Sequence, residues 1–586
     1  MTKILKKIFT SFVILSFLNS ITFAQSISNN ALPTNPTISS GSANISQTTN
    51  KLTVNQNTDK LITNWSSFNI GKDATVQFVQ PSSTSSALNR VTSSDPSYIF
   101  GTLQANGKII LVNPNGVLFA NGAKVDVGSI IASTLKTADK DFLSDQLIFE
   151  KDNLAGTIQN DGTIRAFAGG TVALIGSQVT NNGKIKTKQG TTALLSGDKV
   201  TLTLNGNRLI KYNIDEGTLN SLVENNNAII AKEGVVILSA KALNLLSKSS
   251  VNNTGNIEAK GFSQVGGKIY LDGDQTTNSG KLVASSKNNS GGLIQVTGEE
   301  VKLTSTASLD ASGATGGGTI LVGGSFQNSD PTVRQSRKTI IEGGSILNAS
   351  AKKKDGDGGT IVAWSDINNP NSVTSAQGTF LATGGLNSGN GGNIETSGHY
   401  LSTDSISVNA SGLNKSGTWL LDPYNVTIGS PIAGTAYSSN FTPSATSTIT
   451  ASSIQTSLNS GTSVTITTGS SGSDSGDITI SNSNPISKTS GGNATLTLQA
   501  ARNITIGTSS AITSTSGTLG ITLSSAHASG ATTGGVKIGS NLTSNGGDIL
   551  VGGNQGTAVN GIGYAENYAG GSSNQTSSAI QIDAVT

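Results

Sequence analysis

Several residue types are scarce or absent in this chain of 586 residues. It contains no cysteine, one methionine and two histidines, and only 4% of its residues are aromatic and 12% charged. The usual charged share is about 25%. Without cysteine the chain has no disulfide, no thiolate metal site and no cysteine nucleophile. The shortage of large side chains disfavours an ordinary globular enzyme, whereas recurrent β-branched runs with little charge disfavour disorder.

The first 24 residues have the three-part layout of a secretory signal peptide. Lys3, Lys6 and Lys7 precede an apolar run at 8–18, and Ala24 ends a stretch that suits cleavage. The run of about 11 residues is shorter than the roughly 20 that span a bilayer, so an uncleaved anchor is the weaker alternative. Three of the 37 lysines and arginines lie here and the chain has 34 acidic residues. The exported chain is therefore neutral, with no overall attraction to nucleic acid.

Short strands that begin at a glycine recur along most of the chain. The intervals from Gly170 to Gly190 and from Gly267 to Gly292 are 20 and 25 residues, which matches one coil of a parallel β-helix. Corners at Asn-Gly or Gly-Gly suit such coils because positive φ costs little there. An array of β-sandwiches is the alternative, and the short period argues against it. The glycine-led strands lie at 170–176, 190–197, 234–239, 267–271, 292–296, 318–322, 359–363 and 392–396.

We therefore predict an all-β chain that folds as a right-handed parallel β-helix, with an N-terminal cap and extra-helical hairpins. Alternate residues of each strand are expected to point inward, so that Val, Ile, Leu and Ala stack from coil to coil. A short helix is expected near 137–147, outside the coils. Beyond about residue 430, Ser, Thr, Gly and Asn dominate, which indicates more degenerate coils.

A specific set of motifs begins at Trp65. The strings are WSSFNIG at 65–71, VQFVQP at 76–81, ALNRV at 87–91, DPSYIFGTL at 95–103, ANGKIILVNPNGVLF at 105–119, GAKVDVG at 122–128 and IAST at 131–134. In this order they resemble the N-terminal secretion (TPS) domain of the filamentous haemagglutinin family, closest to its high-molecular-weight adhesin branch. Two further family-like strings are ETSGH at 395–399 and GTWLLDPYNVTI at 417–428. The Asn-Pro-Asn-Leu motif of the haemagglutinin branch is not found.

This resemblance implies a two-partner secretion exoprotein. In such systems the Sec machinery exports the chain to the periplasm of a Gram-negative cell. The secretion domain is then recognised by the periplasmic POTRA domains of an Omp85-class (TpsB-type) outer-membrane transporter. The chain crosses unfolded and builds its β-helix outside, where each added coil releases folding free energy locally. A chain without disulfides suits this route, because a crosslinked chain could not thread.

The resemblance and the residues together divide the chain into four parts. We expect a signal peptide at 1–24, a TPS domain at 25–260, a β-helical shaft at 261–430 and Ser/Thr/Gly-rich degenerate repeats at 431–586.

The candidate secretion motif is Asn113-Pro114-Asn115-Gly116. Pro114 fixes its own φ and restricts Asn113, and Asn115-Gly116 favours a tight turn. Two interpretations remain open: a stiff turn that ends a strand, and direct contact with the transporter.

A second group of candidate residues lies earlier in the same motifs. Trp65 and Phe68 are expected to cover the N-terminal end of the apolar column. The full set of candidate cap or transporter-recognition residues is Trp65, Phe68, Asn69, Asn89 and Arg90.

The sequence gives little support for catalysis. β-Helical lyases and hydrolases need clustered carboxylates, often with calcium. The densest acidic feature, Asp355 to Asp357, is preceded by three lysines and indicates a solvated loop. His399 and His527 lie far apart in sequence, and His399 is expected to be a structural hydrogen-bonding residue near a corner. We predict a non-enzymatic protein without metal or cofactor.

The predicted function is that of a secreted or surface-associated extracellular adhesin, which binds a surface receptor or glycan of unknown identity. The alternative is the N-terminal part of a larger haemolysin or contact-dependent inhibition effector.

Overall fold

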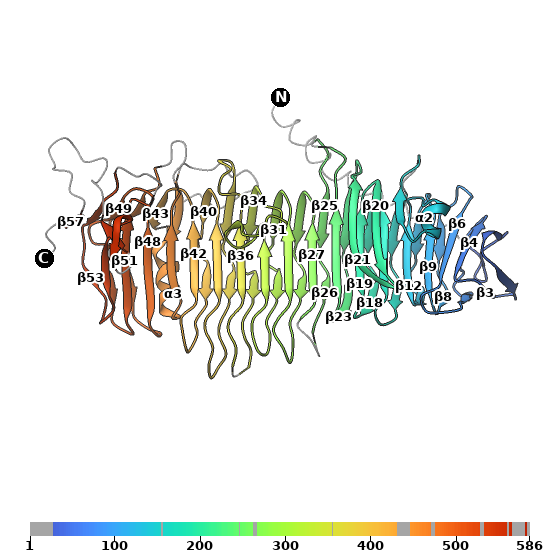
Figure 1. Ribbon diagram of the computed structural model, residues 1–586, viewed down its shortest axis with the longest axis horizontal. Helices are drawn as coiled ribbons and strands as arrows, with labels where there is room; N and C mark the ends of the chain where they lie inside the picture. The colour runs from blue at the N-terminus through green and yellow to red at the C-terminus, as the bar shows by residue number, and fades with distance from the viewer. Residues whose placement is uncertain are drawn as a thin grey trace, which may run out of the picture.

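The computed structural model shows a long rod built from stacked coils (Figure 1). It describes residues 27–582 apart from 154–155, 245, 262–265, 354, 431–445, 470–474, 528–532, 560–561 and 565–579. The expected signal peptide at 1–24 lies outside the described residues. The N-terminal coils form one end of the rod, and the coils that follow residue 450 form the other (Figure 1).

Each regular coil contributes one strand to each of three parallel sheets, here named sheets I, II and III. Sheet I is 20-stranded and sheet III is 14-stranded. One coil consists of β14 (Thr157–Asn160) in sheet II, β15 (Thr163–Ala166) in sheet III and β16 (Thr171–Gly176) in sheet I. The next coil repeats this order with β17 (Gln178–Asn181), β18 (Lys184–Lys188) and β19 (Thr191–Ser196), each parallel to its counterpart. The predicted parallel β-helix is confirmed.

The core is a column of aliphatic side chains inside the coils. Leu174 of β16 pairs in register with Leu194 of β19, and Leu194 pairs with Leu238 of β24 (Val235–Ala240). All three side chains are fully buried. Because neighbouring strands are about 4.8 Å apart, like residues stack in direct contact along the rod. One small core per coil therefore replaces the large aromatic core of a globular domain.

Antiparallel strands close the N-terminal end of the column. β1 (Thr37–Ser40) runs antiparallel to β4 (Lys60–Trp65), and β2 (Ala43–Gln47) runs antiparallel to β3 (Lys51–Gln56). Leu32 is buried in the core, and Ile38 and Ile45 pack against it. This segment is the expected N-terminal cap. It protects an end that would otherwise expose unpaired strand edges and a wet column.

A small antiparallel sheet lies outside sheet I and confirms the expected extra-helical hairpins. It consists of β13 (Leu147–Glu150), β20 (Lys199–Asn205) and β21 (Arg208–Glu216), and the short helix α2 (Asp139–Leu143) precedes it (Figure 1). Phe142 and Phe149 pack with outward-facing residues of sheet I, such as Ile131, in a second hydrophobic cluster. Sheet I is thus buried on both faces in the N-terminal coils.

One helix in the C-terminal coils was not predicted. α3 (Ala451–Asn459) lies against β41 (Ser407–Asn409), the last strand of sheet III, and against β47 (Ile486–Lys488), which begins a separate sheet. Its buried side chains include Ile454 and Leu458. A helical turn therefore replaces a strand on this side of the rod, while sheet I continues past it.

An internal ladder of asparagines interrupts the aliphatic column at one position of sheet II. Each amide nitrogen donates to the side-chain oxygen of the next asparagine along the rod at 2.7 Å. Phe119 precedes the ladder in register, and Leu303 follows it. Buried amides must be hydrogen-bonded to be tolerated, and a slip of two residues along the strand would place an amide against an apolar side chain such as Val179. The ladder therefore fixes the register. Its members are Asn160, Asn181, Asn225, Asn253 and Asn278.

Replacing a middle rung tests this role. In Asn225→Ala the donor of Asn181 and the acceptor of Asn253 lose their partner, which is expected to cost about 2–4 kcal/mol locally. Hydrogen exchange of the full chain should show reduced protection of residues 157–283. Asn226→Ala is the matched control, because Asn226 also bonds to the neighbouring coils, through Asn182 and Thr254, but is exposed, and it should cost about 1 kcal/mol or less. Equal effects of the two variants would contradict a special role of the ladder.

Candidate functional site

The Asn113–Gly116 motif forms the corner between sheets I and II in an N-terminal coil. It links β9 (Lys108–Val112) to β10 (Val117–Phe119). The Gly116 N–H donates to the Asn113 carbonyl at 3.1 Å, which closes a four-residue turn. Pro114 stands at the second position, where its fixed φ fits. The positive φ falls on Gly116, at 123°, a conformation that other residues adopt only with strain.

Asn113 connects its own corner to the preceding coil. Its side chain is fully buried, and its amide nitrogen donates to the Asp95 carbonyl and to Ser97 Oγ, both at 3.0 Å. Its Oδ1 accepts from the Asn115 N–H at 3.0 Å. A side chain here replaces backbone hydrogen bonds that the corner itself cannot make.

The following coil packs directly on the same corner. The Gly156 N–H donates to the Pro114 carbonyl at 2.8 Å, and a Cβ on Gly156 would lie 2.6 Å from the Gly116 nitrogen. Asn115 Nδ2 donates back to the Ser93 carbonyl at 3.0 Å. The motif thus joins three successive coils, as a stiff turn would. Pro114 and Asn115 are partly exposed whereas Asn113 is buried, so only the former two offer side-chain surface to a partner of the folded domain.

Trp65, Phe68 and Asn89 come together inside the first coils. The Trp65 and Phe68 rings meet edge to face, with centroids 5.7 Å apart, and both are fully buried. Trp65 Nε1 donates to Asn89 Oδ1 at 3.0 Å, and Asn89 Nδ2 donates to the Ala87 carbonyl at 3.2 Å. The two rings lie in the first coil behind the antiparallel cap. In the folded domain these three side chains are packing residues that no partner can reach.

Asn69 and Arg90 hold neighbouring segments. Asn69 Oδ1 accepts from the Tyr98 N–H at 2.8 Å. The guanidinium of Arg90 donates to the Thr137 carbonyl at 2.8 Å and pairs with Asp139. Because Asp139 begins α2, Arg90 anchors the extra-helical segment to β6 (Ser86–Val91). The nine candidate residues therefore all lie in the N-terminal coils, and each has a structural contact there.

The later family-like strings meet on the outside of the shaft. His399 is almost buried, and its Nδ1 is hydrogen-bonded to the Ile367 carbonyl at 3.0 Å. Its ring lies against the Tyr424 ring, with centroids 4.3 Å apart. His399 is thus a hydrogen-bonding residue of the packed shaft, as the sequence indicated.

Glu395 is fully buried on the outer face of sheet I, below the loop at 323–337. One carboxylate oxygen accepts from the Gln327 N–H at 2.8 Å and the other from Ser397 Oγ at 2.9 Å. Burial raises the pKa of Glu395 to about 7; the two hydrogen bonds oppose this shift, and the nearby Asp422 adds to it. The carboxyl group therefore titrates in the neutral range while it holds the loop.

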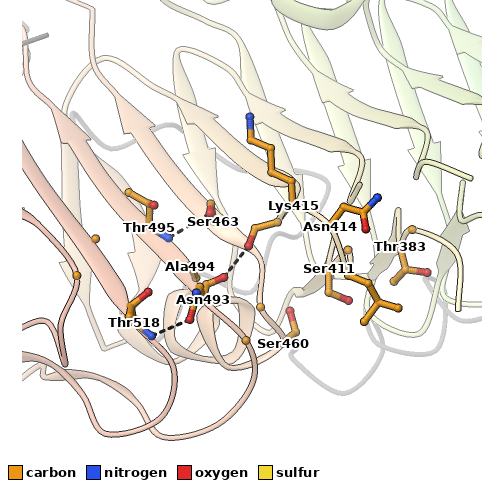
Figure 2. A pocket seen from close by; sticks show the side chains of 18 of the residues that line it. Thr383, Ser411, Asn414, Lys415, Ser460, Ser463, Asn493, Ala494, Thr495 and Thr518 are labelled. Atoms are coloured by element: carbon orange, nitrogen blue, oxygen red, sulfur yellow. Dashed lines mark hydrogen bonds between the residues drawn. The ribbon is translucent and has the colours of Figure 1, made fainter. Parts of the chain in front are cut away.

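A hollow of about 1110 Å³ opens on the C-terminal half of the rod (Figure 2). Its polar groups bond different coils to one another: Ser416 Oγ donates to the Asn493 carbonyl at 2.6 Å, and Asn493 Oδ1 accepts from the Thr518 N–H at 3.0 Å. The walls are therefore built of contacts between coils. Within the part of the chain that the structure describes, no group of three or more His, Asp or Glu could hold a metal ion. In that same part, no helix is long and apolar enough to cross a membrane.

The N-terminal part of the chain matches known proteins. A family model described as the TPS secretion domain matches residues 24–284. The crystal structure of the HMW1 secretion domain from Haemophilus influenzae matches with a TM-score of 0.57 and 29% identity, over 67% of this chain and 100% of that chain. This chain carries a TPS secretion domain. The family match ends at residue 284, whereas the motifs placed the end at about 260. The asparagine ladder and the extra-helical sheet lie within the matched TPS residues.

Two further relatives are each named heme/hemopexin-binding protein, and both come from Haemophilus influenzae. They are 30% and 34% identical to this chain over 271 and 256 residues. The matches cover 45% and 40% of this chain, but only 29% and 27% of those proteins. This chain therefore matches less than a third of each relative's length.

Replacing the buried asparagine of the corner tests its structural role. Asn113→Ala leaves the Asn115 N–H without its side-chain acceptor in a buried corner, and it is expected to cost about 2–3 kcal/mol. Asn115→Ala removes partly exposed bonds and should cost about 1 kcal/mol. Hydrogen exchange of residues 93–133 measures both. A larger effect of Asn115→Ala than of Asn113→Ala would contradict the prediction, because it would show that the corner depends more on its partly exposed side chain than on its buried one.

The titration of Glu395 predicts a pH-dependent shaft. The folded-state pKa, at about 7, exceeds the ordinary value of 4.5, so the folded state holds a proton that the unfolded state has lost. Stability should therefore fall as pH rises from 4.5 through 7. Relative to Glu395→Gln, the wild type should lose about 3 kcal/mol across this window. Thermal unfolding of both proteins from pH 5 to pH 8 measures the difference, and parallel pH profiles would contradict it.

Proposed function

We propose that this chain is an adhesin-type exoprotein, which a cognate Omp85-class (TpsB-type) transporter recognises through its N-terminal domain and carries across the outer membrane. The observation that carries the proposal is a TPS secretion domain at residues 24–284 that continues into a β-helical rod. The Sec machinery delivers the chain to the periplasm, where the transporter's POTRA domains bind it. The mature protein is extracellular and presents its shaft to a receptor or glycan at a cell surface.

The fold supports a stepwise assembly outside the cell. Every regular coil contacts mainly its two neighbours, so each can fold as soon as it emerges on the coil before it. The antiparallel cap and the Asn113–Gly116 corner belong to the first coils. We infer that they form first and give the later coils an edge to pair with. No cysteine is present to crosslink the chain before it crosses.

The second candidate from the sequence is the N-terminal part of a larger haemolysin or contact-dependent inhibition effector. It requires a toxic activity that an adhesin lacks. Lysis of erythrocytes, or killing of neighbouring bacteria by cells that secrete the protein, would favour this candidate. Binding of the purified protein to surfaces without toxicity would favour the adhesin.

Secretion in a reconstituted pair tests the proposed route. The full chain should reach the medium only when its transporter is co-expressed, and appearance without the transporter would refute the proposed export. Asn115→Ala should reduce secretion severalfold if the transporter contacts the partly exposed side chains of the corner, Pro114 and Asn115. Asn348→Ala is the control, because Asn348 is also partly exposed and its side chain also forms a hydrogen bond at a turn outside the TPS domain, where Oδ1 accepts from the Ser350 N–H. Unchanged secretion of Asn115→Ala would refute only a critical role of this corner.

A further inference from the structure

Four exposed lysines gather on the outer face of sheet III in the TPS domain. Lys184, Lys186 and Lys188 alternate with buried residues along β18, and Lys232 ends β23 (Ala228–Lys232). We call them the lysine patch. All four are exposed. Lys188 pairs in register with Lys232 on the adjacent strand, a placement that brings like charges together and is destabilising. Among the described residues, none of the four forms a salt bridge.

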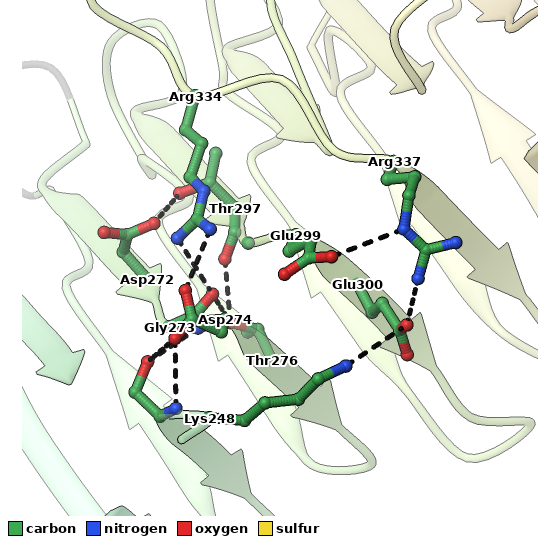
Figure 3. Close-up of polar contacts among 12 residues, drawn as sticks. Lys248, Asp272, Gly273, Asp274, Thr276, Thr297, Glu299, Glu300, Arg334 and Arg337 are labelled. Atoms are coloured by element: carbon green, nitrogen blue, oxygen red, sulfur yellow. Dashed lines mark hydrogen bonds and ion pairs between the residues drawn. The ribbon is translucent and has the colours of Figure 1, made fainter. Parts of the chain in front are cut away.

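Cations near this patch and farther along the rod show the opposite arrangement. Arg165, next to Lys186 in register, is held by both carboxylate oxygens of Asp126, at 2.6 and 2.8 Å. In later coils Arg334 pairs with Asp274 at 2.9 Å, and Arg337 bridges Glu299 and Glu300 (Figure 3). Folding alone favours such neutralised pairs. A group of unpaired lysines in a chain whose exported part is neutral therefore indicates a ligand that supplies the missing negative charge.

The patch is hollowed and has an aromatic wall. The lysines line a depression of about 530 Å³ together with Phe167, Arg165 and Ile230. Phe167 is 40% exposed and lies beside the Arg165 guanidinium, 5.7 Å from its ring centroid. An exposed ring can contact the apolar face of a ligand. The ammonium groups, which are regularly spaced along the strands, can bind several anionic groups of the same polymer.

We propose that the lysine patch is a binding site for an acidic polysaccharide. The lysine ammonium is a point charge on a flexible stem, so several lysines can follow anionic groups that are spread along a polymer. Arginine, with its planar fork of donors, is better suited to binding a single phosphate or carboxylate. The lysines line a depression, whereas a membrane would need a flat or protruding face. Proteins that bind single-stranded nucleic acid typically stack successive bases on several aromatic side chains. The patch has one such ring, which can contact a sugar ring. The proposal deepens the proposed function, because it gives the extracellular protein a class of glycan.

The test uses the purified full chain without its signal peptide, so that binding is measured independently of transport. Heparin is the acidic probe and neutral dextran the uncharged one. The wild type should bind heparin and not dextran, with affinity that falls steeply as salt rises. The patch variant, Lys184→Gln with Lys186→Gln, Lys188→Gln and Lys232→Gln, should bind heparin about tenfold or more weakly, with a shallower salt dependence. Phe167→Ala should weaken binding severalfold without changing the salt dependence.

A matched control removes the same charge elsewhere. Lys72, Lys211, Lys268 and Lys287 are exposed lysines on other parts of the chain, and their joint replacement by glutamine should leave heparin binding within about twofold of the wild type. Neither variant should be less stable than the wild type in thermal unfolding, because none of the replaced lysines forms a salt bridge in the described part of the chain. The patch variant also loses the repulsion between Lys188 and Lys232. The proposal is overturned if the wild type fails to bind heparin at low salt, or if the control loses as much binding as the patch variant. It is also overturned if duplex DNA or anionic lipid vesicles bind the patch more tightly than heparin does. Failed secretion with intact heparin binding would count against the proposed export and leave the patch standing.

Discussion

The structure depends on one constraint: each coil must place its inward side chains directly on those of the coil before it. Parallel strands that pair in a single register bring equivalent residues to within about 5 Å of each other. Because of this spacing, a bulky side chain has little room to avoid the residue stacked on it. Leucine on leucine satisfies this requirement at Leu174 and Leu194. An amide on an amide satisfies it too, since each asparagine both donates and accepts. Charged residues satisfy it poorly, so the column consists mainly of aliphatic side chains.

The corners between the sheets also fix how one coil stacks on the next. At Asn113 the backbone turns from one sheet to another and cannot continue its ladder, so buried side-chain amides complete the hydrogen bonding. Contacts of this kind reach only the adjacent coils. A fold with such short-range contacts can form progressively from one end, because each coil packs on its neighbours and needs no contact with a distant segment. A chain of this type suits the proposed route of secretion followed by folding outside the cell.

The outer faces are free of the stacking constraint and differ along the rod. In the TPS domain the outside of sheet I is covered by α2 and the extra-helical sheet. Farther along, the loop at 323–337 covers it and binds the buried Glu395. Sheet III instead exposes the lysine patch within the TPS domain. Variation of this kind leaves the column untouched, so the surface residues can change while the rod stays the same.

The sequence alone determined the coil period, the parallel β-helix and the secretion family, because alternation and glycine corners are local patterns that repeat. The motifs also located the Asn113 corner. Its contacts with Ser93 and Gly156 could not be foreseen, since neither lies next to it in sequence. The helix α3 had a local signal, Thr450 as its N-cap and buried Ile454 and Leu458 four residues apart, but the Ser/Thr-rich composition obscured it.

Only the tertiary structure decided which residues stack across insertions. Successive rungs of the asparagine ladder are 21, 44, 28 and 25 residues apart, because the extra-helical hairpin at 199–216 separates Asn181 from Asn225. No fixed period connects them. The same holds for the lysine patch, where β18 and β23 become neighbours only after that hairpin folds away. Alternation within a strand is a property of a few residues, whereas lateral pairing depends on where every intervening loop goes.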